Sequence, residues 1–89
     1  MAKTIVKEPP YVERLEAALK RELRGAEVKH EQVRRDRYRF IVVWDRFDRM
    51  GHPERQRKVW DIADHVLEKS DLLNVSMIIT LGLKDIPGD

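Results

Sequence analysis

The apolar residues of this chain recur at helical spacing in two stretches. In the first, the apolar side chains lie three or four positions apart, which predicts a helix with one buried face. They are Val12, Leu15, Ala18, Leu19 and Leu23. The helix should end at Gly25, because glycine adopts a left-handed cap at little cost. The second stretch opens with Pro53, a residue that suits a first helical turn, and we expect its helix to end near Lys69. Its apolar positions are Val59, Ile62, Ala63, Val66 and Leu67.

Three other stretches are typical of β-strands. Residues 38–44 (YRFIVVW) are rich in β-branched and aromatic side chains and predict a central strand, with Tyr38, Phe40, Val42 and Trp44 on one face. Residues 26–35 alternate weakly and predict an exposed edge strand. Residues 75–83 predict the last strand. We expect Val75, Met77, Ile79 and Leu81 to lie on one face of it.

These elements predict the order helix, strand, strand, helix, strand. Both helices must cover one face of a three-stranded sheet, because nothing else in the chain can bury their apolar stripes. We therefore expect a single small α/β (α+β) domain over residues 11–84, with an extended arm at 1–10 and a loose tail at 85–89. The connecting segments 35–37 and 45–51 are expected to be a turn and a loop, residues 70–71 a polar break after the second helix, and Gly82 a bulge.

Composition narrows the function classes. The 89 residues contain no cysteine, so disulfides, thiolate metal sites and thiol catalysis are excluded. No apolar run approaches the roughly 18 residues of a membrane span, and the first residues lack the apolar stretch of a secretion signal. We expect a soluble cytoplasmic protein that does not associate with membranes.

Catalytic and metal-binding patterns are weak. His30, His52 and His65 are the only histidines, and no two have the spacing of a helical zinc site. Asp61 and His65 lie one turn apart, but a metal would need a third ligand from elsewhere. The chain has no nucleophile elbow, phosphate-binding loop or dinucleotide-binding glycine motif. We therefore predict a protein that is not an enzyme and has neither cofactor nor metal.

Charge is distributed unevenly along the chain. Residues 20–60 hold thirteen Lys/Arg against seven Asp/Glu, and residues 61–89 hold two lysines against six acids. The densest basic cluster is Arg34, Arg35, Arg37 and Arg39. It indicates either a surface that contacts phosphates or a solvated hairpin whose long side chains prevent pairing with other strands.

The element order and two short motifs resemble the BolA-like proteins, small α/β modules related in topology to class II KH domains. The motifs are Val43-Trp44-Asp45-Arg46-Phe47 and Arg55-Gln56-Arg57-Lys58-Val59-Trp60, and the resemblance covers about residues 11–84. It implies the same fold and a basic start of the second helix, where nucleic acid binds in proposals for that family. Gln56 and Ser76 stand where the family has histidines. The iron–sulfur role that the family implies, in complexes with monothiol glutaredoxins, therefore lacks its ligands here.

Two hypotheses follow for the function. The first is a nucleic-acid-binding or regulatory module in which a basic patch contacts phosphates. Its residues would be Arg34, Arg35, Arg37, Arg39, Arg55, Arg57 and Lys58. The second is a protein-interaction module, either a homodimer through the edge strand Val28–Val33 or a partner of a monothiol glutaredoxin that ligates no iron–sulfur cluster.

Overall fold

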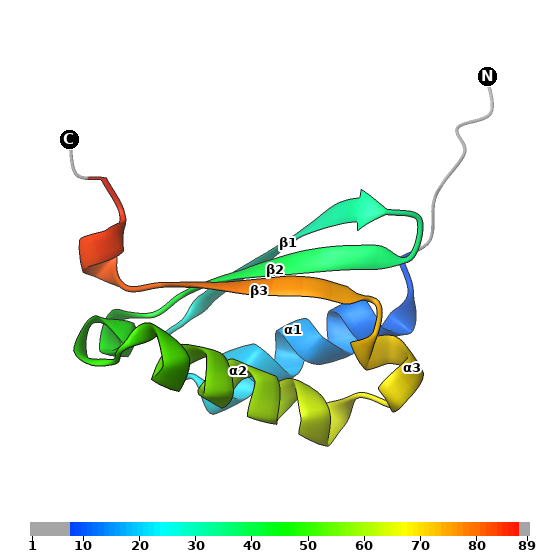
Figure 1. The fold of residues 1–89 in the computed structure, drawn as a ribbon, viewed down its shortest axis with the longest axis horizontal. Coiled ribbons are helices and arrows are strands. Elements are labelled where there is room, and N and C mark those ends of the chain that lie inside the picture. Colours follow the sequence, from blue (N-terminus) through cyan, green and yellow to red (C-terminus); the bar gives the residue numbers. More distant parts are fainter. Residues whose placement is uncertain (1–7, 88–89) are drawn as a thin grey trace.

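The computed structural model describes residues 8–87 and shows two long helices under a three-stranded sheet (Figure 1). The elements follow the order α1, β1, β2, α2, α3, β3, with short 3-10 helices at Asp45–Arg49 and Leu83–Asp85. Their bounds are α1 Pro10–Glu22, β1 Glu27–Arg34, β2 Arg37–Val43, α2 His52–Val66, α3 Lys69–Leu72 and β3 Val75–Leu81. The predicted α+β class and the order of the main elements are confirmed.

The sheet has the order β1-β2-β3, with β1 antiparallel and β3 parallel to the central strand β2. Within residues 8–87, the helices α1, α2 and α3 lie against the same face of the sheet, and no element covers its opposite face (Figure 1). The core fills the space between helices and sheet, and its largest fully buried side chains include Tyr11, Phe40 and Phe47. Burial raises the pKa of Tyr11 to about 12, and its hydroxyl donates to the carbonyl oxygens of Asp36 and Asn74.

The central strand has the predicted faces, whereas the last strand does not. Alternate residues of β2 are buried from Tyr38 onward, and the buried series continues to Trp44 just after the strand. In β3, a β-bulge shifts the register: Tyr38 pairs with Val75, but Arg39 pairs with Met77. The extra residue is Ser76, and one added residue moves every later side chain to the other face. The expectation that Val75 shares a face with Met77, Ile79 and Leu81 is therefore wrong, because Val75 is buried and the other three lie on the opposite face. Ile78 and Thr80 face the helices.

Several element ends differ from the predictions. The first helix begins at Pro10, inside the expected arm, and ends at Glu22; residues 1–7 lie outside the described part of the chain. The second helix ends at Val66, and the expected polar break at 70–71 lies within the short helix α3. The segment 45–51, expected as a loop, contains the 3-10 helix Asp45–Arg49.

Gly82 is not a bulge, because β3 has already ended at Leu81. A Cβ atom at this position would lie 2.9 Å from the backbone nitrogen of Asp48. Glycine therefore lets the segment after β3 pack closely against the 3-10 helix Asp45–Arg49. The carboxylate of Asp48 then accepts a hydrogen bond from the backbone N–H of Lys84 (3.0 Å). Asp85, expected in the loose tail, belongs to the 3-10 helix Leu83–Asp85.

Candidate interaction surface on the open face of the sheet

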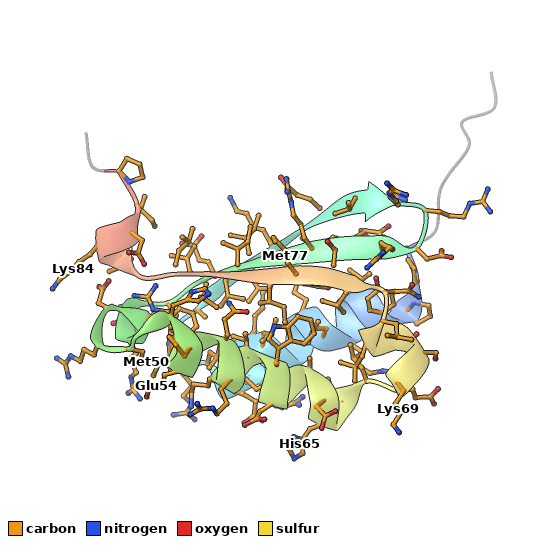
Figure 2. The ribbon with its side chains drawn as sticks, viewed as in Figure 1. Met50, Glu54, His65, Lys69, Met77 and Lys84 are labelled. Carbon is orange, nitrogen blue, oxygen red and sulfur yellow. The ribbon has the colours of Figure 1, made fainter. Side chains whose placement is uncertain are left out.

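The uncovered face of the sheet carries a continuous apolar surface on β2 and β3, which we call the outer stripe. Its residues are Ile41 and Val43 from β2 and Met77, Ile79 and Leu81 from β3. The two strands pair in register here, with Ile41 beside Ile79 and Val43 beside Leu81. Met77, labelled in Figure 2, lies on the side of the sheet away from the helices and is 47% exposed.

The outer stripe departs from the usual pattern of a one-sided sheet. A sheet with one solvated face normally alternates apolar residues inward and polar residues outward. Here Ile41 and Val43 point outward between the buried residues of β2, so this strand is apolar on both faces, as in sheets that are covered on both sides. A contiguous apolar patch on the outside of a protein marks an interaction site more often than apolar residues that are scattered singly over the surface.

Charged residues border the outer stripe along β1. Glu27, Lys29 and Glu31 face outward on this strand, opposite Val43, Ile41 and Arg39 of β2. The guanidinium Nε of Arg39 lies 2.6 Å from a carboxylate oxygen of Glu31. Arg39 therefore belongs to an ion pair on the open face.

The first strand and its hairpin carry the remaining arginines of the predicted cluster. Arg34 pairs with Arg37 across the turn, Arg35 lies within the turn, and all three side chains are exposed. No acidic side chain forms an ion pair with them in residues 8–87. The hairpin is at the opposite end of the molecule from the start of α2 (Figure 1). The seven basic residues predicted as one site therefore do not gather on one surface.

At the start of α2, Arg55 is used inside the fold. Its Nη1 lies 2.7 Å from a carboxylate oxygen of Asp85 and 3.4 Å from the carbonyl oxygen of Thr80, and its Nε donates to the carbonyl of Met50 (3.0 Å). The guanidinium also lies over the Phe47 ring, and only 14% of the side chain is exposed. Arg55 is therefore a packing residue whose Nε and Nη1 are engaged within the fold.

Arg57 and Lys58 are exposed on α2, but they line different hollows. Arg57 lines a shallow hollow with Trp60 and Asp64, whereas Lys58 lines the groove between α1 and α2 with Asp61. The ammonium group of Lys58 also lies 6.0 Å from the centre of the Trp44 ring. These two cations have acidic neighbours and do not form a compact phosphate site with Arg55.

Gln56, which stands where the resemblance places a histidine, binds the outer edge of β3. Its Nε2 donates to the carbonyl oxygen of Ile78 (2.9 Å), and its Oε1 accepts a hydrogen bond from Trp60 Nε1 (3.1 Å). Together with Arg55 at the carbonyl of Thr80, Gln56 occupies backbone acceptors on an edge strand. The sequence contains no local signal for these contacts, because α2 and β3 are distant along the chain.

His30 forms the one charged cluster that reaches under the sheet in the described residues. Its Nδ1 lies 2.8 Å from Glu16 and its Nε2 2.7 Å from Glu8, and Glu16 also pairs with Lys20 at 3.1 Å. Burial acts to lower the pKa of His30, but the hydrogen bonds to Glu8 and Glu16 outweigh it and raise the pKa. Burial acts to raise the pKa of Glu16, but the contacts with Lys20 and His30 lower it on balance. The cluster thus joins β1 to α1 through ionic hydrogen bonds.

No group of three or more side chains suited to holding a metal is found among the described residues. Within the same part of the chain, none of the helices has the length and apolar character needed to cross a membrane.

Comparisons with protein-family models, with curated proteins and with solved structures give no match to this chain. The fold class therefore rests on the structure itself, and the resemblance to the BolA-like proteins stays a prediction. The outer stripe was missed from the sequence because the bulge at Ser76, which separates the face of Val75 from that of Met77, Ile79 and Leu81, has no local signal.

Proposed function

We propose that this protein is a small, non-enzymatic interaction module that binds a protein partner on the open face of its sheet. The observation that carries the proposal is the outer stripe, a contiguous apolar surface in a chain with few apolar residues to spare. Of the chain's residues, 42% are hydrophobic and 38% are charged. Five apolar side chains on an uncovered face are therefore a substantial share of what the core could have used.

The partner surface is expected to be apolar at its centre and charged at one border. The outer stripe would bury its side chains against apolar groups, at roughly 25 cal/mol for each Å² removed from water. The border on β1 offers both charge signs, because Lys29 lies between Glu27 and Glu31. A partner that matches this border gains orientation and register more than affinity.

Site-specific photocrosslinking in the organism that encodes the protein tests this proposal. The photoreactive residue p-benzoylphenylalanine is placed at position 77 on the open face or, as the control, at position 54 on the first turn of α2. Both wild-type side chains are exposed, and Figure 2 labels both positions. We expect a discrete protein adduct from position 77 and none from position 54. Equal adducts from both positions, or none from position 77, would contradict the proposal.

A second candidate function is binding to a nucleic acid through the hairpin. The observation that favours it is the position of Arg34, Arg35 and Arg37 at one exposed turn, where none of them has an ion-pair partner in residues 8–87. Three phosphate contacts would give an affinity that falls steeply with salt. In this candidate the nucleic acid binds at the hairpin and not at the start of α2, where Arg55 is engaged with Met50, Thr80 and Asp85.

Fluorescence anisotropy with labelled DNA and RNA oligonucleotides across a salt series tests the second candidate. A triple alanine variant at positions 34, 35 and 37 should lose at least tenfold in affinity, and Arg39→Ala, which removes a paired arginine, should change little. An affinity that does not vary with salt, or an unaffected triple variant, would overturn this candidate.

A further inference from the structure

The two edges of the sheet differ in what covers their backbone. On β3, side chains of α2 occupy two outward carbonyl oxygens: Gln56 binds that of Ile78 and Arg55 that of Thr80. On β1, no side chain within residues 8–87 donates a hydrogen bond to a carbonyl of the strand. β1 pairs regularly with β2 from Glu27 to Gln32, before an irregularity between Gln32 and Arg34. Free backbone groups along such an edge are a template for pairing with another strand.

We propose that β1 pairs with β1 of a second copy of this chain, antiparallel and around a two-fold axis at His30. A two-fold axis makes such an interface self-complementary. In this register, the position numbers of paired residues add up to 60, so Lys29 of each copy lies opposite Glu31 of the other. The pairing would form two identical ion pairs on the open face and would join the two sheets into one of six strands.

The charges on β1 select this register over its neighbours. A shift that makes the paired numbers add up to 58 places Lys29 opposite Lys29, and Glu27 opposite Glu31. A shift to 62 places Glu31 opposite Glu31. Like charges directly opposite each other on paired strands are destabilising, whereas opposite charges stabilise the pair. The alternation of Glu27, Lys29 and Glu31 therefore disfavours both neighbouring registers and favours the one centred on His30.

The surface beneath β1 is complementary to itself in the same sense. A groove of about 340 Å³ runs between α1 and β1, and it is lined by Glu8, by Glu13, Glu16, Ala17 and Lys20 of the helix, and by His30 of the strand. The two-fold axis would bring the two copies of α1 side by side and antiparallel, with the acidic first half of one beside Lys20 of the other. The His30 ring faces Glu8 and Glu16 of its own chain. These carboxylates offset the charge of His30 at the two-fold axis, where the two His30 residues lie opposite each other.

This surface is an edge of the sheet and the outer stripe is a face, so either proposal can fail without the other. The dimer is tested with the purified chain alone, whereas the test at position 77 detects adducts with other proteins. A band at twice the mass of the chain in that test would count as self-association.

Sedimentation equilibrium of the full chain and of charge variants tests the dimer. Lys29→Glu and Glu31→Lys should each weaken self-association at least tenfold, because each places like charges opposite each other twice. The double variant K29E/E31K exchanges the two charges and should restore association to within about threefold of the wild type. Lys84→Glu, the same charge change on an exposed residue far from β1, should have no effect.

Circular dichroism of each variant confirms that the chain is folded. Loss of association in both single variants excludes a net-charge effect, because Lys29→Glu lowers the net charge and Glu31→Lys raises it. Recovery in the double variant then identifies the pairing of position 29 with position 31, since partial unfolding would not be repaired by a second charge change. A wild-type chain that stays monomeric at millimolar concentration would overturn the proposal. A double variant that associates no better than either single variant would also overturn it.

Discussion

The guanidinium of Arg55 lies 2.7 Å from the carboxylate of Asp85, thirty residues later in the chain. Asp85 also accepts a hydrogen bond from the backbone N–H of Gly82 (2.8 Å), and these two contacts lower the pKa of its carboxyl group. The segment after β3 is thereby attached to the start of α2. An arginine that the sequence offered as a phosphate contact instead connects two elements of the fold.

Arg55→Ala should therefore lower stability, in contrast to the removal of a surface cation. The substitution leaves the carbonyls of Met50 and Thr80 without their donor and removes the group over the Phe47 ring. We expect a loss of about 1–3 kcal/mol in the free energy of unfolding, measured with urea. Arg57→Ala, which removes an exposed arginine two residues away, should cost less than about 0.5 kcal/mol. Equal effects of the two substitutions would contradict the packing role of Arg55.

Gly82→Ala should destabilise the attachment of the segment after β3. The added methyl group meets the backbone of Asp48, which cannot move aside as a flexible side chain would. We expect a cost of about 1–3 kcal/mol in urea denaturation. Gly51→Ala is the matched control, because the nearest atom to a Cβ there is 3.8 Å away. A Gly82→Ala variant as stable as Gly51→Ala would show that the two segments do not pack closely.

Stability should depend on pH through the cluster around His30. Its raised pKa means that the contribution is fully present below the ordinary value of 6.5 and is lost as the pH rises through the folded-state pKa. The lowered pKa of Glu16 means that its contribution is present above the ordinary value of 4.5 and is lost as the pH falls through the folded-state pKa. The cluster therefore stabilises the fold most between about pH 4.5 and 6.5.

Thermal unfolding across a pH series, with His30→Gln beside the wild type, measures this dependence. The difference in melting temperature between the two proteins should shrink as the pH rises above 6.5, because the wild type alone loses a charged hydrogen-bond donor. His65→Gln alters an exposed ring whose Nδ1 contacts only the carbonyl of Asp61, and serves as the control. A constant difference between wild type and His30→Gln across the series would be the contrary result.

The neighbouring residues Ile78 and Ile79 test the face assignment that follows from the bulge. Ile78 is 2% exposed beneath the sheet, whereas Ile79 belongs to the outer stripe. Ile78→Thr should cost about 2–4 kcal/mol in urea denaturation, and Ile79→Thr less than about 1 kcal/mol. The opposite order would restore the faces that simple alternation predicts and remove Ile79 from the open surface.

The sequence predicted those parts of the fold in which a pattern persists over many residues. Both long helices and the central strand have apolar residues at a regular period, and tertiary packing preserved each of them. The faces of β3 could not be predicted, because the bulge at Ser76 is set by pairing with β2 and has no local signature. The partners of Arg55 and Gln56 were out of reach for the same reason, since both contact a strand more than twenty residues away.

The same limit applies to the candidate site. The arginines of the hairpin were visible as a run, and the structure leaves three of them exposed at one turn. The outer stripe has no run in the sequence, because its members come from two strands that are brought together by parallel pairing. An apolar face therefore emerges only once the register is known.

Binding through the outer stripe is tested by combining the photoreactive probe at position 77 with Ile79→Lys. Ile79 lies two residues away on the same strand and the same face, and a lysine there places a charge in the outer stripe while leaving the core intact. We expect the adduct from position 77 to disappear while the melting temperature of the purified variant stays within a few degrees of the wild type. An undiminished adduct in the folded variant would contradict binding through the outer stripe.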